Sequence, residues 1–401
     1  MSYTENYQKW LDFAELPAYL HDELVAMDEK TKEDAFYTNL EFGTAGMRGL
    51  IGAGTNRINI YVVRQATEGL AQLIDSKGEE AKKRGVAIAY DSRHFSPEFA
   101  FESAQVLAAH GIKSYVFESL RPTPELSFAV RHLHTFAGIM VTASHNPAPF
   151  NGYKVYGEDG GQMPPADADA LTDYIRAIEN PFTVQLADLE ESKASGLIEV
   201  IGENVDAEYL KEVKGVNINQ DLINEYGRDM KIVYTPLHGT GEMLARRALA
   251  QAGFEAVQVV EAQAVPDADF STVKSPNPES QAAFALAEEL GRKVDADVLV
   301  ATDPDADRLG VEIRQPDGSY LNLSGNQIGA IIAKYILEAH KTAGTLPENA
   351  ALCKSIVSTE LVTKIAESYG ATMFNVLTGF KFIGEKIHEF ETQHNHTYML
   401  G

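Results

Sequence analysis

The stretch TASHNPAPFNGYK, residues 142–154, brings a hydroxyl, an imidazole and an amine close together in Ser144, His145 and Lys154. It follows residues 137–141, an apolar run that is short and closed by turn formers, so we expect a buried strand that ends just before the serine. Ligands bind in the crevice at the carboxyl ends of strands in open α/β sheets. These residue types at such a place suit phosphoryl or acyl transfer.

The loop after the serine is rich in turn formers. Pro147 and Pro149 restrict the backbone, and Asn151-Gly152 is expected to reverse the chain so that Lys154 returns toward the serine. An isolated Ser-His pair is more often part of an ordinary polar loop than of a site. The loop alone leaves both interpretations open, and the rest of the chain decides between them.

A second motif with chemical potential is DPDADR, residues 303–308, which follows the apolar run 297–302. Alternate positions of an extended loop face one side, so Asp303, Asp305 and Asp307 would form an oxygen cage for a divalent cation. Without a metal their mutual repulsion would raise their pKa values, which disfavours a purely structural role. Mg²⁺ is the natural ion, because it accepts a few carboxylates and leaves room for a phosphate oxygen.

Two other kinds of acidic loop fit this motif less well. An EF-hand loop needs glycine at its sixth position and glutamate at its twelfth, where this chain has Arg308 and Arg314. A phosphatase loop of the haloacid-dehalogenase kind usually has threonine or valine at its fifth position, where this chain has Asp307. A divalent-cation site is the better interpretation.

The glycine-rich segment EFGTAGMRG, residues 41–49, carries one cation, Arg48. It lacks the Gly-Lys-Ser/Thr of a P-loop and the spacing of the dinucleotide-binding fingerprint. Backbone amides and a guanidinium could still meet a phosphate there. Taken alone, the segment is more typical of a tight structural turn.

Strand and helix patterns alternate through most of the chain, which is typical of parallel α/β sheets. We expect strands at 86–91, 113–118, 137–141, 231–236, 256–261, 297–302, 351–358, 371–377 and 397–400, and helices at 97–111, 241–253, 279–291, 324–341, 359–370 and 379–390. Residues 1–40 have helical spacing, and residues 162–215 suit helices and a linker with little strand character. Asp91-Ser92-Arg93 is expected to form a local turn and salt bridge, and the glycines after His238 a turn into a helix.

Composition limits the classes of function. The 401 residues exceed one ordinary domain, and a formal net charge of −24 at pH 7 would repel nucleic acid and anionic membranes. A phosphorylated substrate would be repelled as well, unless local cations or a metal ion meet it. The single cysteine, Cys353, excludes an intramolecular disulfide framework and fits a cytoplasmic location. We expect no signal peptide and no membrane-spanning segment.

Taken together, the motifs resemble those of the α-D-phosphohexomutases. TASHNP followed by NGYK, DPDADR later in the chain and GTAGMRG before both carry a resemblance that covers residues 40–401. YTPLHGTG, SPNPE and TGFKFIGEKI are similar to the phosphoglucomutase/phosphomannomutase branch. The resemblance implies an α/β fold of tandem domains with mixed, mostly parallel sheets, the first three domains of four. Domain I would span residues 1–205 with the phosphoserine loop, domain II residues 206–316 with the metal-binding loop, and an incomplete, sugar-recognising domain III residues 317–401.

The resemblance also implies a metal site shared by two motifs. Ser144 would carry a phosphoryl group, and this group would complete the coordination of one Mg²⁺ per chain. The implied ligands are Ser144, Asp303, Asp305 and Asp307. Phosphoryl transfer requires little covalent chemistry from the protein, so the positioning of the substrate and the neutralisation of its charge would supply the catalysis.

Further roles follow from the same resemblance. Lys154 would exchange the proton of the sugar hydroxyl as general acid/base, His145 would assist beside the serine, and Arg48 would stabilise the transferring phosphate. A nearby metal would lower the pKa of the lysine toward neutral pH. The implied substrate-binding residues are Thr44, Arg48, Ser144, His145, Lys154, Asp307, Arg308, Thr378 and Gly379.

The implied activity is that of a phosphoglucomutase, which interconverts glucose 1-phosphate and glucose 6-phosphate with glucose 1,6-bisphosphate as intermediate and activator. A phosphomannomutase or phosphopentomutase of the same family and an inactive metal- or sugar-phosphate-binding fragment are the alternatives. Intact members continue past the position of Gly401 into a sugar-reading loop and a fourth, phosphate-binding domain. We therefore expect a C-terminally truncated member with sharply reduced turnover, because a mutase must bind the phosphate that is not reacting while the other phosphate is transferred. The substrate sugar and the oligomeric state stay open.

Overall fold

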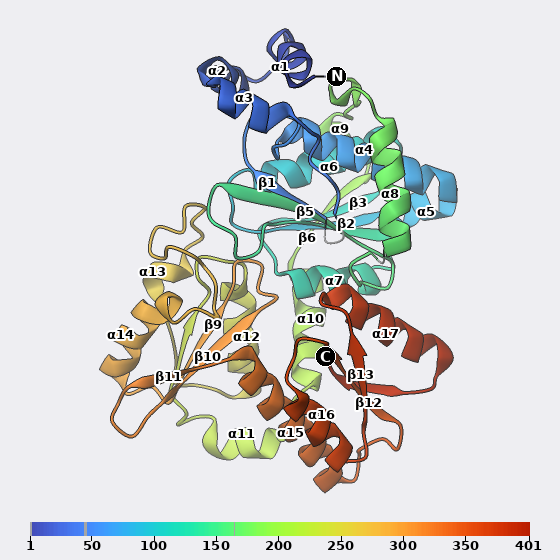
Figure 1. Cartoon of the computed structure of the whole chain (residues 1–401). Helices are drawn as coiled ribbons and strands as arrows, with labels where there is room; N and C mark the ends of the chain where they lie inside the picture. Colours follow the sequence, from blue (N-terminus) through green and yellow to red (C-terminus); the bar gives the residue numbers. More distant parts are fainter. Residues whose placement is uncertain (1, 44–45, 164) are drawn as a thin grey trace. The chain divides into compact units, whose positions relative to one another are not determined.

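The computed structural model describes residues 2–43, 46–163 and 165–401 (Figure 1). The chain divides into two compact units, one of residues 1–202 with 267–269 and the other of residues 203–266 with 270–401. Both units combine helices with mixed or parallel sheets. The predicted fold class, tandem α/β domains with mixed, mostly parallel sheets, is confirmed.

The first unit is built on a sheet with strand order β1-β5-β4-β2-β3-β6. Its strands are β1 (Met47–Leu50), β2 (Val86–Tyr90), β3 (Ser114–Phe117), β4 (Ala137–Val141), β5 (Phe150–Tyr156) and β6 (Ile198–Ile201). Strands β4, β2, β3 and β6 run parallel, whereas β5 is antiparallel to both of its neighbours. Every residue of β2 and β4 is buried, as expected for strands with helices on both faces.

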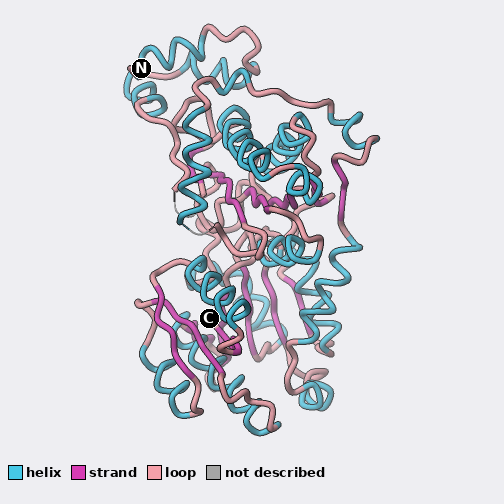
Figure 2. The backbone as a smooth tube through the Cα atoms, turned by 90° about the vertical axis from the view of Figure 1, so that its right-hand side faces the viewer, coloured by secondary structure: helices cyan, strands magenta, loops and turns pink. Residues whose placement is uncertain are grey.

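Helices cover both faces of this sheet, which Figure 2 shows nearly edge-on. They are α1 (Tyr3–Leu11), α2 (Ala18–Ala26), α3 (Glu29–Phe36), α4 (Ile60–Lys77), α5 (Glu79–Arg84), α6 (Ser96–Ala109), α7 (Thr123–His132), α8 (Pro165–Ala177), the 3-10 helix η1 (Pro181–Thr183) and α9 (Leu189–Ala194). Helices α4 and α6 lie on one face of the sheet and α7 on the other (Figure 1). The sheet is therefore open to ligands only at its edges and strand ends.

The predicted helical arm at residues 1–40 consists of α1, α2 and α3 and packs onto the first unit through aromatic side chains. Trp10, the only tryptophan of the chain, is 2% exposed. Its ring makes edge contacts with Phe36, Tyr61 of α4 and Phe182 of η1 at centroid distances of 5.2 to 5.9 Å. The fluorescence of Trp10 therefore reports whether the arm is docked.

The described part of the second unit contains two sheets, with strand orders β11-β10-β9-β7-β8 and β13-β12-β14. Their strands are β7 (Ile232–Thr235), β8 (Val257–Val259), β9 (Val298–Thr302), β10 (Leu309–Arg314), β11 (Tyr320–Leu323), β12 (Ala350–Ser355), β13 (Thr372–Val376) and β14 (Thr397–Leu400). In the first sheet β10 is antiparallel to β9 and β11, and the other pairs are parallel. The second sheet is parallel throughout.

The helices of the second unit connect most of these strands in the βα order that the sequence predicts, whereas β9, β10 and β11, of which β10 and β11 were not predicted, follow one another without a helix. The helices are α10 (Glu203–Gly215), α11 (Gln220–Tyr226), α12 (Gly241–Ala252), α13 (Glu261–Ala264), the 3-10 helix η2 (Gln281–Phe284), α14 (Ala285–Val294), α15 (Gly325–Ala343), α16 (Glu360–Ser368) and α17 (Phe380–Gln393). The ends of α15 follow local chemistry: Ser324 and Gln327 form a capping box at its start, and Gly344 ends it at φ 70°.

Three expectations about local structure are wrong. Residues 198–201 form the strand β6 inside a region expected to hold only helices and a linker. Residues 47–50 around Arg48 form the strand β1 rather than part of a turn. Asn151-Gly152 lies within β5, and the chain reverses earlier, where Asn146 N donates to Ala143 O and Phe150 N to Pro147 O. Lys154 is therefore brought back by strand pairing and not by an Asn-Gly turn.

Glu312 of β10 is a carboxyl group buried inside the second unit. Its side chain is 0% exposed, and Oε1 accepts a hydrogen bond of 3.2 Å from Asn322 Nδ2 on β11. Oε2 has no hydrogen-bond partner among the described residues. Burial raises the pKa of Glu312 to about 7; the nearby Glu288 adds to the shift and Arg292 opposes it. Below about pH 7, Glu312 is therefore mainly protonated in the folded protein.

We expect Glu312→Gln to stabilise the protein at pH 8 and to change little at pH 4. Between the unfolded pKa of about 4.3 and about 7 the folded wild-type protein keeps a proton that the unfolded chain releases, so wild-type stability falls as pH rises. Glutamine removes this penalty, which is roughly 3 to 4 kcal/mol above pH 7. Urea unfolding at both pH values measures the difference. Glu338→Gln, at an exposed position of α15, is the control, and a gain that is equal at both pH values would contradict the assignment.

Candidate active site

Three neighbouring strands of the first unit bring the predicted catalytic residues to one side of the sheet. In the β1-β5-β4 order, Arg48 pairs with Gly152, Lys154 pairs with Met140, and Ser144 follows the end of β4. A Cβ at Gly152 would lie 2.5 Å from Thr142 O and 2.7 Å from Met47 O. The absence of a side chain at this position lets the three strands approach closely.

Ser144 is held in an unusual conformation. It has φ 53°, in the left-handed region that serine rarely adopts, and it is 2% exposed. Its backbone N–H donates to Thr142 Oγ1 at 2.8 Å, and its Oγ lies 3.1 Å from His145 Nδ1. The loop thus fixes the serine hydroxyl next to an imidazole that can exchange a proton with it.

The hydrogen-bonded surroundings of the loop include a buried acid, Asp91, directly after β2. Asp91 Oδ2 accepts from Thr142 Oγ1 at 2.6 Å and lies 3.3 Å from Arg93 Nε. Burial raises the pKa of Asp91, while the Arg93 guanidinium and hydrogen bonds from Thr142, the Arg93 N–H and Ser96 oppose the shift. Three donors converge on this group, so we treat it as a carboxylate.

Lys154 projects from β5 on the face opposite to its neighbour Tyr153. The Tyr153 hydroxyl lies 3.0 Å from Thr67 Oγ1 of α4, and successive strand side chains alternate between faces. Lys154 is 3% exposed. A Cβ at Gly46, which has φ 90°, would lie 2.3 Å from Tyr153 O and 2.9 Å from Lys154 Cα. Gly46 therefore lies directly against the strand that carries Lys154. Thr44, also predicted to bind substrate, lies outside the described residues.

The acidic motif of the second unit links β9 to β10. One ligand atom from each of Asp303, Asp305 and Asp307 lies within 4.8 Å of the others. Asp303 and Asp305 are fully buried, whereas Asp307 is exposed. The motif is not the extended loop that we expected: Ala306 has φ 52°, and its N–H donates to Asp303 O at 2.9 Å. A turn, rather than strand alternation, gathers the carboxylates.

The residues around the acidic motif explain two other sequence features. A Cβ at Gly239 would lie 2.4 Å from Pro304 Cα, and Thr240 N donates to Pro304 O at 2.8 Å, so the glycine turn before α12 packs against the acidic loop. Arg308 N donates to Asp303 Oδ1 at 3.0 Å, and Arg308 Nη1 lies 3.3 Å from Glu279 Oε1. The SPNPE segment thus contributes the partner of the predicted substrate-binding arginine.

The donor set fits a hard divalent cation. Three carboxylates, two of them buried, supply only oxygen ligands, and their mutual repulsion in a protein interior is relieved by a positive ion. The exposed Asp307 gives the cluster access to solvent. Among the residues that the structure describes, neither a cysteine nor a histidine joins the cluster, and this favours Mg²⁺ over softer metals.

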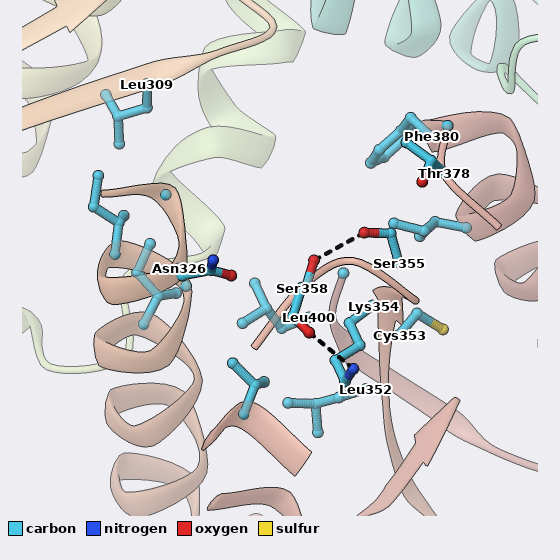
Figure 3. A pocket seen from close by; sticks show the side chains of 18 residues that line it. Leu309, Asn326, Leu352, Cys353, Lys354, Ser355, Ser358, Thr378, Phe380 and Leu400 are labelled. Carbon is cyan, nitrogen blue, oxygen red and sulfur yellow. Dashed lines mark hydrogen bonds between the residues drawn. The ribbon is translucent and has the colours of Figure 1, made fainter. Parts of the chain in front are cut away.

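A pocket of about 410 Å³ lies at the carboxyl ends of the third sheet (Figure 3). Thr378 and Gly379, predicted to recognise the sugar, line it where β13 leads into α17. Lys354 of β12 also lines it and was not predicted. Its side chain is 4% exposed, and Nζ donates to Ser358 O at 3.2 Å and Glu360 Oε1 at 2.9 Å. The available signal was a lysine directly after the apolar run of residues 350–353.

The predicted residues are thus divided between the units. Arg48, Ser144, His145 and Lys154 belong to the first unit, and the acidic motif, Arg308, Thr378 and Gly379 to the second. That Ser144 and the three aspartates share one ion stays a prediction. No helix in the described ranges combines the length and the apolar character needed to cross a membrane.

Comparison with protein families gives three consecutive matches. They are phosphoglucomutase/phosphomannomutase alpha/beta/alpha domain I at residues 39–182, domain II at residues 207–316 and domain III at residues 324–400. Each segment contains motifs discussed above: the serine loop in the first, the acidic motif in the second and Thr378-Gly379 in the third.

Individual relatives agree with these matches. A phosphoglucomutase of Staphylococcus epidermidis RP62A is 40% identical over 365 residues, 91% of this chain and 64% of the relative. A phosphoglucomutase of Staphylococcus haemolyticus is 39% identical over 378 residues, 93% of this chain and 67% of the relative. The chain therefore spans about two-thirds of the length of these relatives.

Solved structures share the fold. A phosphoglucomutase/phosphomannomutase family protein of Burkholderia thailandensis has a TM-score of 0.66 at 19% sequence identity, and the match covers 90% of this chain and 71% of the Burkholderia chain. The phosphoglucomutase pp63/parafusin of Paramecium, in an open form, has a TM-score of 0.67 at 20% sequence identity. This match covers 88% of this chain and 65% of the Paramecium chain. At these identities the likeness shows the fold alone.

Proposed function

Because the chain belongs to the phosphoglucomutase/phosphomannomutase family, we propose that it interconverts glucose 1-phosphate and glucose 6-phosphate through a phosphorylated Ser144. The observation that carries this proposal is the fixed serine hydroxyl beside His145, on strands that also bear Arg48 and Lys154. A hydroxyl beside a potential base, with cations nearby, is the arrangement that a phosphoryl carrier needs.

The proposed chemistry is a phosphoryl transfer in two directions. A hydroxyl oxygen of the hexose phosphate forms a bond to the phosphorus on Ser144 Oγ while the bond from phosphorus to Oγ breaks. Lys154 takes the hydroxyl proton, and Arg48 faces the charge on the transferring group. The resulting glucose 1,6-bisphosphate then returns its other phosphoryl group to Oγ, and Lys154 gives the proton back.

The acidic motif and the third sheet have separate proposed roles. Asp303, Asp305 and Asp307 would hold one Mg²⁺, which neutralises phosphate charge when bound. Arg308 and the pocket lined by Lys354, Thr378 and Gly379 would contact the sugar phosphate. These cations are needed because the chain as a whole repels anions.

We also propose the domain boundaries predicted above, 1–205, 206–316 and 317–401. The three family matches fall inside them. The first sheet lies within the first domain and the third sheet within the third, whereas β11 of the second sheet lies just past residue 316. The second compact unit contains residues of both the second and the third proposed domain, whereas the first domain forms most of the other unit.

A coupled assay tests the activity. We expect the 401-residue chain to convert glucose 1-phosphate to glucose 6-phosphate only when both Mg²⁺ and glucose 1,6-bisphosphate are present. Mannose 1-phosphate and ribose 1-phosphate in the same assay test the phosphomannomutase and phosphopentomutase alternatives. Sugar-phosphate binding without conversion of any substrate would support the third alternative, a binding protein.

A further inference from the structure

We propose that Arg93 is a positioning residue that holds the Ser144 loop in the conformation needed for phosphoryl transfer. The inference rests on the proposed function. The expected local salt bridge after β2 is present, with Arg93 Nε 3.3 Å from Asp91 Oδ2. The Arg93 side chain also reaches the loop that follows β4 and lies inside it.

The Arg93 guanidinium donates to four backbone carbonyl oxygens of that loop. Nη2 bonds to Ser144 O and Asn146 O, each at 2.5 Å, and Nη1 bonds to Pro147 O and Phe150 O, each at 2.9 Å. These acceptors extend from the serine itself to the first residue of β5. A single fully buried side chain therefore spans the complete chain reversal.

The Asp91 carboxylate completes the hold on the serine from its other side. Asp91 Oδ2 accepts from Thr142 Oγ1, which in turn accepts from the Ser144 N–H. Asp91 also lies 3.3 Å from Arg93 Nε, and both side chains are fully buried. The ion pair thus fixes the N–H of Ser144 through Asp91 and its C=O through Arg93.

The end of the loop is tied to the same network. Asn151 Nδ2 donates to Ser96 Oγ and to His94 O, both at 2.9 Å. Ser96 Oγ donates to Asp91 Oδ1 at 2.8 Å. The residues between 91 and 96 therefore hold the loop at both ends.

Such a hold is needed because the conformation of Ser144 is intrinsically unfavourable. A non-glycine residue at φ 53° persists only where its surroundings impose it. Asp91 balances the charge of Arg93, so the pair offers no net charge to an anion and its contribution is geometric. A displacement of about 1 Å in a reacting group lowers a transfer rate by about 100-fold.

Arg93→Lys tests the proposal because it keeps a cation beside Asp91 but loses the fork. One ammonium cannot serve the acceptors of both Nη1 and Nη2. We expect phosphorylation of Ser144 by glucose 1,6-bisphosphate, followed by intact mass, to slow by about 100-fold. We expect kcat to fall similarly with KM changed by less than about 3-fold, since substrate contacts are retained. Amide hydrogen exchange across residues 143–150 should rise.

Arg84→Met is the matched control. Arg84 also donates to two backbone carbonyl oxygens, His134 O at 2.9 Å and Thr135 O at 3.1 Å, but before β4 rather than after it. Its loss should leave the phosphorylation of Ser144 unchanged. If Arg93→Lys does not fold, the double variant D91N/R93M replaces it, because it removes both buried charges together. We expect the double variant to slow the phosphorylation of Ser144 as Arg93→Lys would.

The outcomes separate this inference from the proposed function. Phosphorylation of Arg93→Lys at the wild-type rate would overturn the positioning role, and so would an equal loss in Arg84→Met. If the wild-type protein takes up no phosphoryl group while exchange across the loop still rises in Arg93→Lys, the proposed function fails and the hold of Arg93 on the loop stands.

Discussion

Replacement of Ser144 by alanine is expected to abolish both phosphoryl uptake and mutase activity. Incubation of the wild-type protein with glucose 1,6-bisphosphate should add the mass of one phosphoryl group, whereas Ser144→Ala should gain none. Activity should fall by about 10⁴-fold or more, because the transferred group has no other carrier. Alanine has the same Cβ as serine and adds no new strain at φ 53°, so the loss reports the missing hydroxyl.

Ser92→Ala is the control for this experiment. Ser92 follows β2 in the same sheet, and its buried hydroxyl has no hydrogen-bond partner within the part of the chain that the structure describes. Its removal should leave phosphoryl uptake intact. The emission of Trp10 should match the wild type in both variants, which would show that the first unit is folded. Phosphoryl uptake by Ser144→Ala at the wild-type level would place the carrier elsewhere.

The sequence indicated the position of Ser144 because the signal is local. The run 137–141 is short, apolar and followed by turn formers, and the structure forms β4 over those five residues. The same argument located the acidic motif after β9. For β4 and β9, a short apolar run followed by turn formers therefore located the strand end, and the chemistry-bearing residues lie just past it.

Other features depend on partners far away in the chain and left no local signal. The hydrogen bonds from Arg93 reach residues 51 to 57 positions further along, whereas the short motif at 91–93 indicated only a local turn and salt bridge. Strand β6 is an edge strand with exposed Glu199 and Val200 between buried isoleucines, a pattern that does not alternate. Strand β1 exists because glycine positions let it approach β5. Contacts with residues far away in the chain, rather than local β-strand propensity, therefore determine where these strands form.

A large effect in the second unit is also expected from Asp305→Asn, and its sign depends on magnesium. Without Mg²⁺ the variant should be more stable than the wild type by about 1 kcal/mol, because one of three crowded, partly buried carboxylates loses its charge. With Mg²⁺ at about 100 times its dissociation constant, the wild type should gain about 2.7 kcal/mol. The variant should gain far less, since the ion loses a charged ligand.

Thermal unfolding with and without Mg²⁺, together with calorimetric titration of the ion, measures both effects. Asparagine keeps the size of the side chain and one of its oxygens, so packing changes little. Asp317→Asn is the control: Asp317 Oδ1 caps Ser319 in the turn between β10 and β11, and asparagine can accept the same bonds. This control should respond to Mg²⁺ as the wild type does. Equal stabilisation of Asp305→Asn and the wild type by the ion would show that the three aspartates do not hold it, and the charge argument for the site would fail with it.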